Sequence, residues 1–94
     1  MAFARLAFFP QGTQEQHQAV SKALGDAMSD APGRLVFAAG QSDDGFHLIQ
    51  IWESQEALTG WVDAHLGRAF AAAGSRGYKF PPTVIDFEVS EVRF

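Results

Sequence analysis

Two side chains are candidates for acid–base or anion-binding chemistry, His65 and Arg5. His65 falls in an apolar helical stripe, and a histidine titrates near neutral pH, so it could accept a proton from a substrate. The alternative is a core histidine satisfied by one hydrogen bond. Arg5 interrupts an apolar strand, and we expect it on the open face of the sheet. There it could stabilise an anionic substrate or enolate, or pair with an acidic residue of a second subunit such as Glu88.

Two further side chains could hold a ligand. Trp61 could stack on a flat molecule, or it could pack against the sheet or at a subunit interface. Gln50 is the polar residue on its face of an apolar strand, so it needs a hydrogen-bond partner if it is buried. That partner could be a second chain or a ligand. The apolar residues expected to complete this small-molecule site are Leu35, Phe37, Leu48 and Phe70.

The positions of the other polar candidates give weaker indications of a binding or catalytic role. His17 is expected at the solvated edge of a helix, and Tyr78 in a loop, either as a surface residue or as a lid over the pocket. The three histidines are scattered and cysteine is absent, so we expect no metal site and no thiol chemistry. The sequence contains no Ser-His-Asp order and no phosphate-binding loop. We therefore expect no cofactor.

Composition indicates one globular domain over residues 1–94. Hydrophobic residues make up 47% and charged residues 19% of the chain, which is typical of a folded protein. The net charge of −4 and the absence of a basic run argue against nucleic acid or a membrane as a partner. No apolar run is long enough to span a membrane, and the N-terminus lacks the pattern of a signal peptide. A cytoplasmic protein is the expectation.

The elements are organised around the stretch Phe46–Gly74. Residues Phe46–Trp52 read as a strand that is largely apolar on both faces, and Ser54 has the position of an N-cap. A long amphipathic helix follows and ends at Gly74, a plausible C′ glycine. Elsewhere the pattern predicts three further strands, Phe3–Phe9, Leu35–Ala39 and Thr83–Val92. It also predicts a helix that begins at a capping box of Thr13 and Gln16 and is ended by Asp30, Pro32 and Gly33. The predicted loops are a hairpin loop, Gly40–Gly45, and the segment Ser75–Pro82.

This order is βαββαβ, the ferredoxin-like arrangement of the α+β class. Two helices cover one face of an antiparallel four-stranded sheet, yet the strands at 35–39 and 46–52 are apolar on both faces. A monomer rarely leaves such a patch exposed. We therefore expect a homodimer in which two sheets meet across a two-fold axis and form an α+β barrel.

Residues 48–70, LIQIWESQEALTGWVDAHLGRAF, resemble the antibiotic biosynthesis monooxygenase-like proteins, which are dimeric α+β barrels. The resemblance rests on a hydrophobic strand ending in Trp52-Glu53-Ser54, followed by Glu56-Ala57 and the aromatic Trp61. It covers the element order of nearly the whole chain. It implies one pocket per subunit, between the open sheet face and the second helix.

The resemblance also bears on activity. Members include cofactor-free monooxygenases of polyketide-like aromatics, haem-degrading enzymes and small proteins of unknown role. Trp61 matches the tryptophan that stands over haem, but Arg5 and Ala71 occupy the places of the asparagine and histidine of that branch. We therefore expect no haem turnover.

Three functions stay open at this point. The first is a cofactor-independent oxygenase that deprotonates a small aromatic phenol or enol, with His65 or Arg5 assisting and Trp61 holding the ring. The second is a non-catalytic small-molecule-binding or dimerisation module of the same fold. The third is a domain that retains only a structural role.

Overall fold

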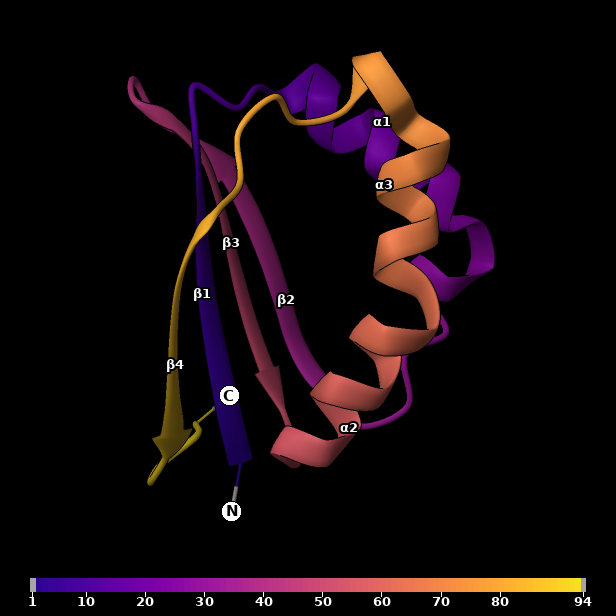
Figure 1. Cartoon of the computed structure of the whole chain (residues 1–94). Helices are drawn as coiled ribbons and strands as arrows, with labels where there is room; N and C mark the ends of the chain where they lie inside the picture. Colours follow the sequence, from indigo (N-terminus) through magenta and orange to yellow (C-terminus); the bar gives the residue numbers. More distant parts are fainter. Residues whose placement is uncertain (1, 94) are drawn as a thin grey trace.

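The computed structural model describes residues 2–93. It contains one antiparallel sheet with the strand order β2-β3-β1-β4, and Figure 1 shows the helices layered against one side of it. The predicted ferredoxin-like α+β fold is confirmed. The elements are β1 (Ala2–Pro10), α1 (Gln14–Leu24), β2 (Arg34–Gln41), β3 (Gly45–Trp52), α2 (Gln55–Trp61), a π-helical segment (Val62–Leu66), α3 (Gly67–Ala73) and β4 (Thr83–Val89), with 3-10 turns at Gly25–Met28 and Gly74–Arg76.

Both α1 and α2 begin at side-chain caps. The Thr13 hydroxyl accepts from the Gln16 N–H, and the Gln16 side chain accepts from the Thr13 N–H, so the predicted capping box is present. The Ser54 hydroxyl accepts from the Ala57 N–H at the start of α2. These caps satisfy N–H groups that have no partner within their helices, and they set where each helix leaves the sheet.

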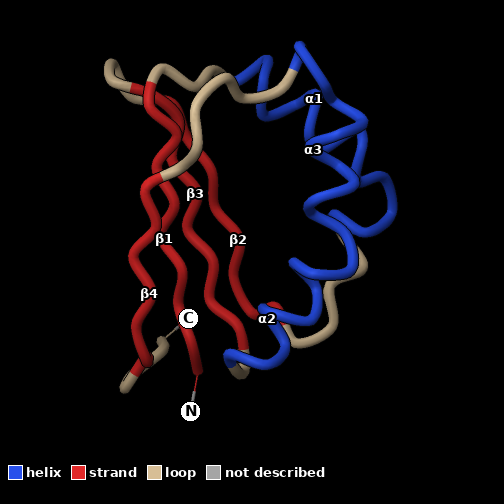
Figure 2. The backbone as a smooth tube through the Cα atoms, viewed as in Figure 1, coloured by secondary structure: helices blue, strands red, loops and turns tan. Residues whose placement is uncertain are grey.

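The second helix is interrupted, where the sequence predicts one continuous α-helix. Between α2 and α3 the backbone follows the wider π-helical winding over Val62–Leu66. A π turn bonds residue i to residue i+5 and so brings residues five apart onto one face. Leu66 therefore lies on the same inward-facing side of the helix as Trp61, and both residues line the same cavity. Figure 2 shows this layer running alongside the sheet from α2 to α3.

The register of β1 against β3 divides the sheet into two faces. Phe3 pairs with Trp52 and Phe9 with Phe46, and these side chains point towards the helices. The largest fully enclosed side chains are Trp52, Phe46 and Leu58. β4 ends at Val89, three residues before the predicted end at Val92.

The opposite face of the sheet carries apolar side chains that no helix covers. Ile85 is 58% exposed, and Ile49 and Phe87 are each 45% exposed. Leu35 was expected as a pocket wall, but a β-bulge shifts the register between Arg34 and Val36 and leaves Leu35 45% exposed. We call this surface the open face; its large apolar residues are Leu6, Phe8, Ile49, Ile51, Ile85 and Phe87.

The substitution Thr13→Ala tests the cap of α1. It removes the hydroxyl that accepts from Gln16, and we expect the free energy of unfolding to fall by about 1 kcal/mol. Chemical denaturation measures this change. Thr59→Ala, at an exposed position of α2, is the control and should change stability by less than about 0.5 kcal/mol. Equal losses in both variants would contradict the assigned cap.

Candidate functional site

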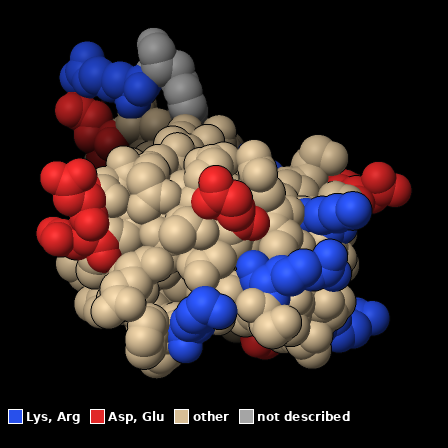
Figure 3. Space-filling model, turned by 90° about the horizontal axis from the view of Figure 1, so that it is seen from above, with Lys and Arg blue, Asp and Glu red and all other residues tan. Residues whose placement is uncertain are grey.

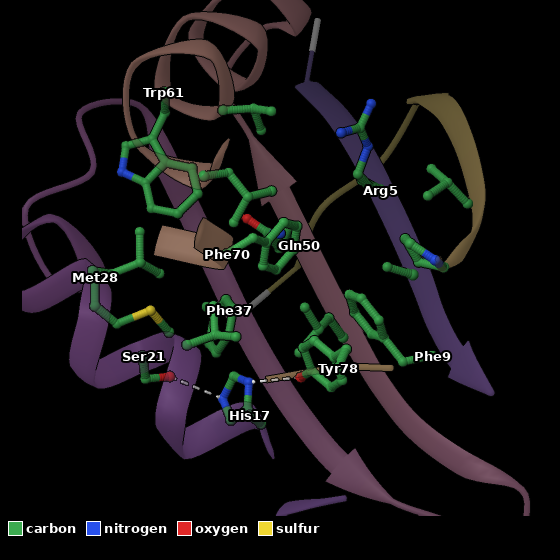
Figure 4. A pocket seen from close by; sticks show the side chains of 18 residues that line it. Arg5, Phe9, His17, Ser21, Met28, Phe37, Gln50, Trp61, Phe70 and Tyr78 are labelled. Atoms are coloured by element: carbon green, nitrogen blue, oxygen red, sulfur yellow. Dashed lines mark hydrogen bonds between the residues drawn. The ribbon is translucent and has the colours of Figure 1, made fainter. Parts of the chain in front are cut away.

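A partly open cavity of about 90 Å³ lies between the helix-facing side of the sheet and the layer of α1, the π segment and α3. Figure 4 shows its side chains converging from both layers. The walls are mainly apolar and aromatic, as in most small-molecule sites. Six of the residues expected at the site line this cavity: Arg5, Phe37, Leu48, Gln50, Trp61 and Phe70.

His65 does not line the cavity. Its ring lies 5.8 Å from the Trp61 ring, and it borders a shallow surface depression with Pro32 and Glu56. The α-helical stripe predicted His65 on the inward face. The π winding instead turns Leu66 inward, and His65 lies at the outer edge. The structure therefore leaves His65 outside the cavity that six of the other expected site residues line, although its ring lies beside the outer side of Trp61.

Arg5 faces the helices, where the sequence predicted the open face. It lies opposite Gln50 on β3 and Asp86 on β4. Its Nε and Nη2 atoms each donate to a carboxylate oxygen of Asp86 at 2.8 Å, so the partner is Asp86 of the same chain and not Glu88 of a second one. This bond holds the pKa of Arg5 above its ordinary value, and it holds the pKa of Asp86 below its ordinary value. The guanidinium thus enters the cavity already neutralised by a carboxylate.

Gln50 is buried, and its partner belongs to its own strand. Its Oε1 atom accepts from the Trp52 Nε1–H at 3.1 Å. No hydrogen bond from its amide nitrogen is found within residues 2–93, and the residue lines the cavity. That nitrogen is available as a hydrogen-bond donor to a ligand oxygen.

Trp61 serves both the core and the cavity wall. Its Nε1–H donates to the carbonyl of Ala27 at 3.0 Å, and its ring contacts Trp52 at a centroid distance of 5.8 Å. The Arg34 guanidinium lies 5.8 Å from the same ring and donates to the carbonyl of Met28. Because Trp61 is 7% exposed and held on three sides, it gives the cavity a rigid aromatic wall.

A polar group that the sequence did not predict lies at one end of the cavity. His17 of α1 is half-buried, with Nδ1 3.1 Å from the Tyr78 Oη and Nε2 3.4 Å from the Ser21 Oγ (Figure 4). All three residues line the cavity. His17 and Ser21 follow the helical spacing of the apolar residues Val20 and Leu24, which is a signal present in the sequence. Tyr78 comes from the loop before β4, and no periodicity could place it.

Burial shifts both ionisations in this group towards the neutral forms. It lowers the pKa of His17 below its ordinary value of 6.5. It raises the pKa of the Tyr78 hydroxyl well above its ordinary value of 10. Both shifts follow from the cost of holding a charge away from water. Near neutral pH the pair is an uncharged imidazole beside a protonated phenol.

The cavity therefore has two polar ends joined by aromatic walls. One end holds Arg5 and Gln50, and the other holds His17 and Tyr78. A flat molecule with an oxygen at its edge could pack on the walls and hydrogen bond at either end. Within the described residues no cluster of three histidine, aspartate or glutamate side chains could hold a metal ion.

Charged side chains on the surface do not form a single acidic or basic patch on the face shown in Figure 3. Seen from above, acidic and basic residues are interspersed on that face and leave wide uncharged areas (Figure 3). No helix within residues 2–93 is long and apolar enough to cross a membrane.

The variant Asp86→Asn tests the pair with Arg5. Because the pKa of Asp86 is lowered in the folded state, the pair stabilises the fold above pH 3.8, and its contribution is lost as the pH falls below that value. Wild type should exceed Asp86→Asn in stability by up to about 1 kcal/mol at neutral pH. This difference should vanish in acid, as followed by denaturation across pH.

Glu88→Gln is the matched control for Asp86→Asn, since it neutralises the next carboxylate on the same face of β4. We expect no comparable difference for it. If Glu88→Gln were the variant with the larger and pH-dependent loss, Arg5 would have the partner that the sequence predicted.

No family model and no curated protein matches the sequence. Solved structures do match the fold. One is a Chloroflexus aurantiacus protein named provisionally as an antibiotic biosynthesis monooxygenase, with a TM-score of 0.69 and 17% identity over 98% of this chain and 97% of that one.

Two other solved structures extend the comparison. A Streptomyces coelicolor monooxygenase in complex with the ligand nanaomycin D has a TM-score of 0.60 and 25% identity, covering 99% of this chain and 90% of that one. A dimeric ferredoxin-like protein of unknown function from Jannaschia has a TM-score of 0.66 and 15% identity, covering 95% and 100%. The resemblance seen in residues 48–70 is thus confirmed at the level of structure: this chain has the fold of the antibiotic biosynthesis monooxygenase-like proteins.

Proposed function

We propose that the protein binds a small aromatic molecule in this cavity and oxidises it with molecular oxygen, without a cofactor. The observation that carries the proposal is a cavity with aromatic walls and a polar group at each end. An electron-rich phenol that loses its proton reacts with oxygen itself. Such a reaction needs a proton acceptor, a stabilised anion and exclusion of water. The ligand-bound Streptomyces coelicolor monooxygenase, which shares the fold, supports the same reading.

The size of the cavity limits the substrate. Pockets for drug-sized ligands measure about 300–1,000 Å³, and an engineered cavity of about 150 Å³ takes benzene. At about 90 Å³ this cavity is smaller than either, so its walls must move to admit even a single ring, and they would have to move further for a larger ring system. A phenol or hydroquinone of one ring is therefore the substrate class that we propose.

The roles of the lining residues follow from their contacts. Phe37, Leu48, Trp61 and Phe70 pack against the ring, and Gln50 donates to one of its oxygens. Arg5 uses two N–H groups for Asp86 and retains others that can stabilise a developing anion. His65 has no role in the proposal, because it lies outside the cavity.

A second candidate is a non-catalytic module that only binds such a molecule. The Arg5–Asp86 pair favours it, because a cation already neutralised by a carboxylate stabilises an anion less well. Binding without oxygen consumption identifies this alternative.

We further propose that the protein is a homodimer formed through the open face. Ile49, Ile85 and Phe87 are each 45% exposed or more on that face, and a second copy would cover them. The ferredoxin-like structure from Jannaschia, which shares the fold, is named as dimeric. A stable interface of this kind buries about 2,000 Å² or more in total.

The variant Ala7→Leu tests the cavity by filling it. Ala7 is buried on β1 and lines the cavity, so three added carbon atoms would occupy the space of the ligand. We expect oxygen uptake with a one-ring hydroquinone to be lost and the melting temperature to hold or rise. The control, Ala72→Leu on the exposed side of α3, should leave both unchanged.

Substrate size gives the same experiment a second arm. Wild-type protein should consume oxygen with one-ring hydroquinones and not with a naphthalene diol or an anthrone. Uptake that survives in Ala7→Leu would show that the reaction does not occur in this cavity. Binding of the hydroquinone without uptake in wild type would favour the binding module.

The variant Ile85→Arg tests the dimer. It places a charge on the open face at β4, the edge strand of the sheet, where a second copy would cover it and burial without a partner is costly. We expect sedimentation to show a dimer for wild type and a monomer for the variant. Ala72→Arg, on the helical side, should remain dimeric. A monomeric wild type at micromolar concentration would contradict the proposal.

A further inference from the structure

We propose that Tyr78 and His17 form a proton relay that accepts the hydroxyl proton of a phenol bound in the cavity. The inference rests on the proposed function and adds to it the residues that handle the proton. The geometry that supports it is the 3.1 Å contact between the Tyr78 Oη and the His17 Nδ1 at the wall of the cavity.

Both rings of the relay are held in place by stacking. The Tyr78 ring lies 3.6 Å from the Phe9 ring at an interplanar angle of 11°. The His17 ring lies 4.7 Å from Phe46 at 25° and 6.1 Å from Phe37 at 17°. A proton acceptor needs a fixed position within hydrogen-bond distance, and these contacts provide one without a covalent constraint.

The hydrogen bonds fit one tautomer of His17 that can accept a proton. In that tautomer the Tyr78 hydroxyl donates to Nδ1, and the Nε2–H donates to the Ser21 Oγ at 3.4 Å. Burial keeps the pKa of His17 low and the pKa of Tyr78 high, so the pair rests in the uncharged state that this tautomer requires.

Few other ionisable groups face the relay. Phe37 and Phe46 of the sheet pack against the His17 ring, and Ser21 comes from its own helix. Among residues 2–93, the titratable side chain that hydrogen bonds to the His17 ring is that of Tyr78. Arg5 lines the same cavity but is bound to Asp86.

The transfer balances within the site. The substrate hydroxyl gives its proton to the Tyr78 Oη as Tyr78 gives its own proton to the His17 Nδ1. One substrate O–H bond and one tyrosine O–H bond break, while a new tyrosine O–H bond and an N–H bond form. The electron pair stays on the substrate oxygen, and the products are a phenolate, a neutral Tyr78 and an imidazolium that donates through Nε2 to Ser21. No oxidant takes part in this step.

The test uses para-nitrophenol, a one-ring phenol whose anion absorbs at longer wavelength than its neutral form. Its methyl ether, para-nitroanisole, is the matched ligand without a proton. The negative charge of a phenolate beside the relay raises the pKa of His17 in the complex, which offsets the effect of burial. With wild-type protein at a pH below the ionisation of the free phenol, we therefore expect saturable binding of both ligands and the phenolate band for nitrophenol alone.

Two variants remove the relay and retain its shape. His17→Gln keeps a polar group near Tyr78 but does not titrate, and Tyr78→Phe keeps the ring that stacks on Phe9. We expect both to bind para-nitroanisole as wild type does and to lose the phenolate band. Oxidation of a one-ring hydroquinone should fall by about 10²- to 10⁴-fold, the usual contribution of a proton acceptor. His65→Gln, which lies outside the cavity, should change neither the band nor the rate.

The outcomes separate the relay from the proposed function. A phenolate band that persists in His17→Gln and Tyr78→Phe would overturn the relay and assign the anion to Arg5, while leaving binding intact. A band lost only in His65→Gln would overturn it in favour of the residue predicted from the sequence. Failure of wild type to bind either nitroaromatic would overturn the proposed function, and the relay with it.

Discussion

The pairing of β1 with β3 determines which side chains of the sheet line the cavity. Its register sets Phe3 against Trp52 at one end and Phe9 against Phe46 at the other, and both pairs are buried under the helices. Between them the small side chain of Ala7 leaves space that the helices do not fill. A shift of one residue would turn Arg5 and Gln50 to the open face and the apolar set away from the helices. The cavity therefore depends on the same contacts that hold the sheet to its helical layer.

The π-helical segment determines which residues of the second helix line the cavity. Its wider turn brings Leu66 to the cavity and leaves His65 beside Trp61 at the outer edge. Such segments often occur at functional sites, because they realign side chains without ending the helix. The loop before β4 then brings Tyr78 across to His17 of α1, so that residues 61 positions apart in the chain form one polar group.

The elements were predictable from sequence because they rest on local signals. Short apolar runs bounded by turn residues marked most of the strands, and the caps at Thr13 and Ser54 marked the starts of the helices. Besides Arg5, five of the expected site residues line the cavity, since a side chain of known parity on a strand, or on the inward stripe of a helix, has a determined face. The predicted face of Arg5 was wrong, because its partner Asp86 became evident only from the pairing of β1 with β4.

Non-local structure accounts for the remaining differences. No sequence pattern predicts a π segment, so His65 was placed by an ideal helical period that this helix does not keep. The β-bulge between Arg34 and Val36 leaves Leu35 exposed, so this residue does not line the cavity wall as predicted. His17 shared the apolar spacing of its helix, but its role depends on a tyrosine that only the folded loop brings near.

The location of a bound phenol tests the central claim most directly. In a crystal structure with para-bromophenol, anomalous scattering would locate the bromine, and the electron density would locate the hydroxyl. We expect a ring between Phe37 and Trp61, with the phenol oxygen within hydrogen-bond distance of the Tyr78 Oη. A phenol bound on the open face, or in the depression beside His65 while the cavity stays free of it, would contradict the account.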